Sequence, residues 1–81
     1  MYGIRGIPLE AQYLYRKGME LSAQERDEAA VRCFRQAVTI APRFTGAYRE
    51  LGNCLVRLGK PGAAKDCFFR SGQALTAGNG S

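Results

Sequence analysis

The chain has 81 residues, enough for one small domain, and its hydrophobic content of 46% is that of a folded protein rather than a disordered segment. It contains no histidine, which excludes the commonest general base, the usual zinc ligand and the nucleophile systems that depend on it. No apolar run reaches the roughly 18 residues that span a bilayer, and the first residues lack the apolar core of a secretory signal. We therefore expect a cytoplasmic protein that is not an enzyme and that uses no cofactor and no metal.

The net charge of +5 is unevenly distributed along the chain. Residues 1–42 carry six basic and five acidic side chains, whereas residues 43–81 carry six basic and two acidic ones. This distribution predicts an acidic partner along the second half, with nucleic acid as the competing interpretation.

The three cysteines are odd in number, and their spacing is not that of a metal site. We expect Cys33, Cys54 and Cys67 to be small buried hydrophobic residues in a reducing compartment, because a redox-active thiol needs exposure and a cationic setting.

Hydrophobic periodicity and turn residues predict four helices and therefore an all-α fold. Pro8 begins the first helix and Pro42 ends the second, because proline suits the first turn of a helix but disfavours helix in the residue before it. The sequence Gly59-Lys60-Pro61 turns the chain before the fourth helix. The expected ranges are about Leu9 to Ser22, Asp27 to Ala41, Thr45 to Leu58 and Pro61 to Leu75.

Two segments of 34 residues, Ala11–Phe44 and Thr45–Gly78, share six identical residues at equivalent positions. Because one helical hairpin of this length cannot bury its own apolar face, it must stack on a neighbour. The repeat predicts a surface that holds another molecule rather than a catalytic pocket. The shared residues are small or apolar, as packing requires: Gly18/Gly52, Leu21/Leu55, Ala29/Ala63, Ala30/Ala64, Cys33/Cys67 and Phe34/Phe68.

The start of the second helix has two interpretations. The segment Ser22-Ala23-Gln24-Glu25 matches a capping box, which would begin this helix near Ala23. The repeat instead places a turn around Glu25–Asp27. We follow the repeat, because the second copy has clear turn residues at the same point.

Gly18 and Gly52 both fall inside a predicted helix, where glycine costs about 1 kcal/mol relative to alanine. We expect Ala30 and Ala64 on the following helices to provide the reason, since two small residues let paired helices approach closely. The repeated phenylalanine, Phe34 in the first copy, would fill the space beside this contact.

The two segments resemble tetratricopeptide repeats, whose motif has the same period. The resemblance implies four antiparallel helices in two stacked helix-turn-helix hairpins. It divides the chain into a flank at 1–10, repeats at 11–44 and 45–78, and a disordered tail at 79–81. The second copy contains Tyr48-x-x-Leu51-Gly52-x-x-Leu55, Gly59 and Ala64-x-x-x-Phe68; the first contains Leu14-x-x-Lys17-Gly18-x-x-Leu21, Ala30-x-x-x-Phe34-x-x-Ala37 and Pro42.

The resemblance also implies a concave groove that binds a protein or peptide. Arg49, Asn53 and Arg57 are spaced by four and form one stripe, which faces an apolar stripe on the first helix. Because arginine holds carboxylates in a bidentate fork and Tyr and Met accept apolar anchors, we expect an acidic peptide with a hydrophobic residue. The alternative is that both arginines are ordinary solvated residues. The implied groove residues are Gln12, Tyr15 and Met19, then Arg49, Asn53, Val56 and Arg57.

The second copy differs from a continuing array, because Lys65 and Gly72 stand where the first copy has Val31 and Val38. Such arrays need about three repeats for stability. The chain is therefore either a fragment of a longer array or a homo-oligomer that completes its core by self-association. Phe69 is the candidate self-association residue, unless its ring folds over the end of the last helix.

Single-stranded RNA binding is the second functional hypothesis, because related helical repeats read RNA and the chain is basic. Two repeats would read too few bases to be specific. A steep dependence on salt would distinguish RNA from a peptide partner.

Overall fold

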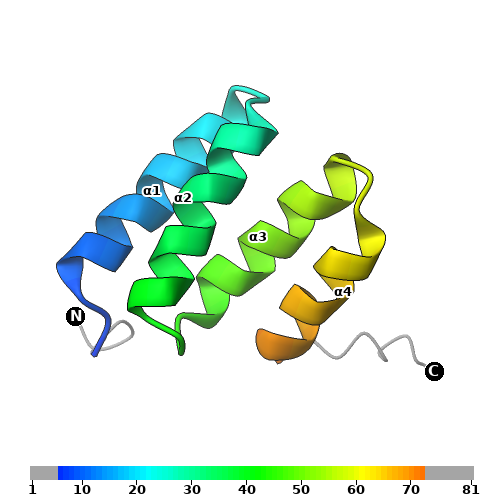
Figure 1. The fold of residues 1–81 in the computed structure, drawn as a ribbon. Coiled ribbons are helices and arrows are strands. Elements are labelled where there is room, and N and C mark those ends of the chain that lie inside the picture. Colours follow the sequence, from blue (N-terminus) through cyan, green and yellow to red (C-terminus); the bar gives the residue numbers. More distant parts are fainter. Residues whose placement is uncertain (1–5, 73–81) are drawn as a thin grey trace.

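The computed structural model describes residues 6–72, which form four helices and no strand. The helices are α1 (Leu9–Ala23), α2 (Asp27–Ile40), α3 (Thr45–Arg57) and α4 (Pro61–Arg70). Figure 1 shows two helical hairpins side by side, with the α1–α2 and α3–α4 turns at the same end of the molecule. The all-α prediction is therefore confirmed, and all four helices begin at the residues expected.

The two hairpin turns have the same backbone hydrogen bonds at a spacing of 34 residues. The amide of Arg26 donates to the carbonyl of Leu21 over 2.9 Å, and that of Lys60 donates to Leu55 over 2.8 Å. This bond closes a helix through a residue in the left-handed region. That residue is Gly59 in the second turn, with φ of 78°, and Glu25 in the first, with φ of 62°.

The turn settles where α2 begins. Glu25 lies outside the helices, so the expected turn around Glu25–Asp27 is confirmed and the capping-box interpretation is wrong. A glutamate in the left-handed region carries a steric cost of roughly 1–2 kcal/mol that glycine avoids. The first turn keeps this geometry because the hydrogen bonds around it require it.

The fourth helix is shorter than expected. It ends at Arg70, whereas the sequence predicted a helix to Leu75, which lies outside the described residues together with the expected tail at 79–81. Gly72 has a φ of 84° and its amide donates to the carbonyl of Phe69. The Ser71 hydroxyl donates to the carbonyl of Phe68 over 2.8 Å. These bonds occupy the last carbonyls of α4 and stop the helix.

The core is continuous from one hairpin to the other. Phe34 of α2 is fully buried and packs with residues of α3 and α4, so the hairpins share one apolar interior. A second group of small residues closes the opposite end around Phe44. The main group comprises Ala30, Val31, Phe34, Leu51, Cys54, Leu55, Ala64 and Cys67; the second comprises Ala11, Ala37, Ala41, Phe44 and Ala47.

The two mid-helix glycines make room for phenylalanine rings and not for the alanines that the sequence suggested. A Cβ atom on Gly18 would lie 2.7–2.9 Å from three ring atoms of Phe34. A Cβ atom on Gly52 would meet the Phe68 ring at the same distances. These contacts are closer than van der Waals packing allows, so each ring lies directly on its glycine. The ring, rather than Ala30 or Ala64, is the reason that glycine is needed.

This packing predicts different costs for the same substitution in the two hairpins. Gly18→Ala should lower the free energy of unfolding by about 1–2 kcal/mol, because overpacking against a fully buried ring outweighs the helix propensity that alanine gains. Gly52→Ala should cost less than about 0.5 kcal/mol, because the half-buried Phe68 ring can move outward. Urea unfolding followed by circular dichroism measures both values. Equal losses in the two variants would contradict this explanation.

Candidate functional site

The candidate site is the face along which α1 and α3 lie next to each other. Tyr15, at the middle of α1, approaches the start of α3: its hydroxyl would be 3.6 Å from a Cβ atom on Gly46. Near the ends of both helices, Ser22 Oγ lies 3.8 Å from Cys54 Sγ and accepts a hydrogen bond of 2.6 Å from Arg57 Nη2. These two contacts hold the helices side by side and in the same direction.

Four of the predicted groove residues are available between these contacts. Met19 of α1 is 38% exposed and Val56 of α3 is 51% exposed. Arg49 is exposed and Asn53 is half-buried. The carboxylate of the adjacent Glu50 lies 3.8 Å from Arg49 Nε, a long contact for an exposed pair. Arg49 is thus available to a ligand.

Gln12 and Tyr15 have structural roles that the sequence did not indicate. Gln12 Nε2 donates to the carbonyl of Ile7 over 2.8 Å and ties the chain before α1 to the helix. The Tyr15 ring is half-buried, with its centroid 5.9 Å from that of Phe34 and 4.8 Å from that of Phe44. Tilted aromatic pairs at these distances stabilise a core. Tyr15 therefore joins the two groups of core residues more than it lines a groove.

Arg57 is held by an intramolecular ion pair. Its Nε lies 3.2 Å from both carboxylate oxygens of Asp27, and its Nη2 lies 3.0 Å from Oδ1. The hydrogen bonds from Arg57 lower the pKa of Asp27, and the same bonds raise the pKa of the guanidinium. In this structure the guanidinium is thus already paired with a carboxylate of the chain itself.

The Arg57 contacts connect three helices. Ser22 belongs to α1, Asp27 begins α2 and Arg57 ends α3. Asp27 also suits its position in the first turn of α2, because an acidic residue there interacts favourably with the helix dipole. A signal that could have found the pair is the turn register, which places Asp27 at the same end of the molecule as Arg57.

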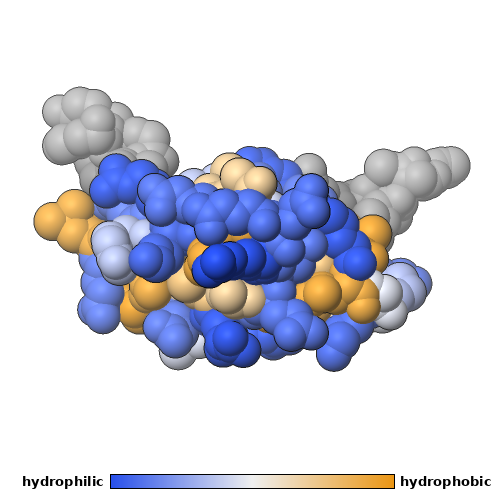
Figure 2. Space-filling view, turned by 90° about the horizontal axis from the view of Figure 1, so that it is seen from above, coloured by the Kyte–Doolittle hydropathy of each residue, from blue (hydrophilic) through white to orange (hydrophobic). Residues whose placement is uncertain are grey.

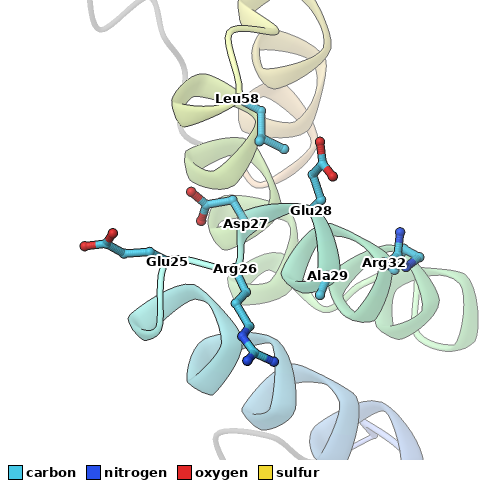
Figure 3. A pocket seen from close by; sticks show the side chains of 7 residues that line it. All are labelled: Glu25, Arg26, Asp27, Glu28, Ala29, Arg32 and Leu58. Carbon is cyan, nitrogen blue, oxygen red and sulfur yellow. The ribbon is translucent and has the colours of Figure 1, made fainter.

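A pocket of about 460 Å³ lies at the end that carries the two hairpin turns. Figure 3 shows that the Glu28 side chain points toward Leu58, while Glu25 and Asp27 project to another side. Figure 2 looks onto this end and shows a mainly hydrophilic surface with hydrophobic areas near its centre and at its sides. The lining residues are Glu25, Arg26, Asp27, Glu28, Ala29, Arg32 and Leu58.

The pocket has the character of a charged surface and not of a metal centre. Within residues 6–72, no three acidic, cysteine or histidine side chains come together in a way that could hold a metal ion. The described helices also include none that is long and apolar enough to cross a membrane.

The three cysteines are free thiols. Cys54 and Cys67 are buried, and burial raises the pKa of both thiols. Cys33 is half-buried. Because a raised pKa keeps a thiol protonated and a poor nucleophile, Cys54 and Cys67 act as the small core residues that the sequence predicted.

The fold and the site define the class of the protein: a helical repeat whose two hairpins stack through a shared core and leave the α1–α3 face open. The family model for the tetratricopeptide repeat matches residues 11–44. An uncharacterized protein of Methanocaldococcus jannaschii is 33% identical over 61 residues, which cover 75% of this chain and 71% of that protein. No solved structure matches. The chain belongs to the tetratricopeptide repeat family, whose members are generally interaction modules without enzymatic activity.

The Arg57–Asp27 pair predicts a pH-dependent contribution to stability. The pKa of Asp27 is below its ordinary value of 3.8 in the folded chain, so the pair stabilises the fold above that value and loses its effect as the pH falls through the lowered pKa. Arg57→Met should lower the free energy of unfolding by about 1 kcal/mol at neutral pH, the upper end for an exposed pair. In acid, at a pH below the lowered pKa, Asp27 is protonated in both proteins and the difference should disappear.

Urea unfolding of both proteins at the two pH values measures this effect. Arg49→Met is the matched control, because Arg49 lies far from Asp27 along α3 and its own carboxylate contact is long. A loss in Arg57→Met that is equally large at low pH would mean that the aliphatic stem, and not the ion pair, supplies the stabilisation.

Proposed function

We propose that this chain is a protein-interaction module whose α1–α3 face binds a short peptide or helix that carries a hydrophobic residue next to an acidic one. One observation carries the proposal: α1 and α3 lie side by side and present a mixed apolar and cationic surface. Met19 and Val56 are exposed on it, and Arg49 is available beside them. An apolar anchor would contact Met19 and Val56. A neighbouring carboxylate would pair with Arg49, and the Asn53 amide can bond the peptide backbone.

The role of Arg57 in this proposal is to shape the face. Its bonds to Ser22 and Asp27 fix the upper end of α3 against α1 and α2. Tyr15 does the same at the start of α3 through its contact with Phe44, and Gln12 holds the chain before α1. These three residues would support binding through the position of the helices.

The proposal predicts that binding depends on exposed residues of this face. In fluorescence anisotropy with labelled peptides that place a Glu beside a Leu or Phe, Met19→Ala combined with Arg49→Glu should weaken binding by at least about tenfold. Tyr13→Ala combined with Arg16→Glu is the matched control on the outer side of α1, where both side chains are exposed. Circular dichroism checks that each variant is folded. Equal weakening by the control pair would overturn the proposal.

Salt dependence separates this function from RNA binding. A peptide held by one ion pair and an apolar anchor should lose little affinity with added salt, whereas RNA affinity falls steeply with the number of phosphates contacted. Tight binding of single-stranded RNA with a steep salt slope would favour the alternative function.

Self-association through Phe69 is a further part of the proposal. The ring is 76% exposed at the end of α4, where a third hairpin or a second copy could cover it. Light scattering after size-exclusion chromatography should show a dimer that Phe69→Asp converts to monomer. A monomer in both samples would sink the self-association idea.

We also propose a cytoplasmic location. Its support is the set of three free thiols, which a reducing compartment preserves.

A further inference from the structure

A second groove lies between α2 and the turn that joins α3 to α4. It has a volume of about 280 Å³. Val31 and Leu55 are buried at its base, and Leu58 is half-buried. Its lining residues are Glu28, Val31, Arg32, Arg35, Leu55, Leu58 and Lys60.

Three exposed cations surround this apolar base. Arg32 and Arg35 are three residues apart and share one side of α2. Lys60 approaches from the α3–α4 turn. The cations therefore stand on both sides of the groove.

Within residues 6–72, none of the three cations has a carboxylate partner. All seven acidic side chains lie in the described range, and the ion pairs there are Arg49–Glu50, Arg57–Asp27 and Arg70–Asp66. Glu28 lines the groove without an ion pair to Arg32, Arg35 or Lys60, and Figure 3 shows it directed toward Leu58. The groove thus carries an excess of positive charge that the folded chain leaves uncompensated.

This groove is separate from the α1–α3 face. Its lining residues belong to α2, to Leu55 of α3 and to the α3–α4 turn, and none of them is one of the predicted groove residues on α1 and α3. A ligand in the groove would contact α2 and the second turn without touching Met19, Asn53 or Val56.

We propose that this groove is a second binding site and that it takes an acidic peptide segment, with carboxylates on Arg32, Arg35 and Lys60 and one apolar side chain over Leu58. Charge complementarity selects the occupant, because three unpaired cations around a small apolar base match carboxylates that flank a hydrophobic residue. A groove of about 280 Å³ has room for one apolar side chain of a bound peptide.

The test uses the whole chain labelled with ¹⁵N and a synthetic peptide of Glu, Leu and Ala as the probe. Titration should shift the amide signals of Arg32, Arg35 and Lys60 in the two-dimensional NMR spectrum. Arg32→Glu combined with Arg35→Glu should weaken this site by about tenfold, because two attractive contacts become repulsive. A peptide with Gln in place of Glu should leave these signals unshifted.

Two control variants make the result specific. Arg16→Glu with Lys17→Glu introduces the same change of charge at exposed positions of α1 and should leave binding at the groove unchanged. Arg49→Glu should also leave it unchanged, so failure of the α1–α3 proposal and failure of this one are distinguishable. Shifts confined to Met19, Asn53 and Val56 would overturn the second site. Equal weakening by the α1 pair would overturn it as well, and binding of single-stranded RNA at these residues in place of the peptide would assign the groove to nucleic acid.

Discussion

The fit of the Phe34 ring against Gly18 is the contact on which the rest of the structure depends. The ring occupies the place of a Cβ atom on α1, so α1 and α2 can come together only where glycine leaves that space. The same ring is fully buried and reaches the core residues of α3 and α4. One side chain thereby closes the first hairpin and attaches it to the second. Gly52 and Phe68 repeat the contact in the second hairpin, where the ring is only half-buried.

The difference between the two copies follows from position in the stack. Phe34 is covered by the second hairpin, whereas no hairpin within residues 6–72 follows Phe68. Because stacking supplies most of the burial in helical repeats, the last hairpin has the weaker core. Phe69, next to Phe68, is exposed, and α4 already ends at Arg70. Both features are found at the end of the stack that no further hairpin of the described chain covers. A neighbouring hairpin or a second copy would bury more of the apolar surface of α4 and stabilise it. This gain in burial is the physical basis for the proposed self-association.

The sequence predicted the fold well because local signals and the repeat agreed. Prolines and turn residues placed the starts of the helices, and the second copy resolved the ambiguity at Glu25. The site was harder to predict. Arg57 and Asp27 are 30 residues apart, and their pairing depends on how the hairpins stack. The rotation of Tyr15 toward Phe44 and the early end of α4 likewise depend on contacts and backbone angles that no spacing in the sequence reports.

The Arg57–Asp27 pair also changes where the basic character of the chain lies. The sequence predicted a stripe of Arg49, Asn53 and Arg57 along the groove, but one of its two arginines is paired with a carboxylate of the chain itself. Arg32, Arg35 and Lys60, in contrast, line one groove and have no ion pair within residues 6–72. The Arg57–Asp27 pair forms because stacking brings the end of α3 next to the start of α2, so it removes charge from the contact between the hairpins and leaves the cations of the groove unpaired. A repeat protein this small can therefore present a mainly apolar contact on one side and an electrostatic one on the other, with the stacked core between them.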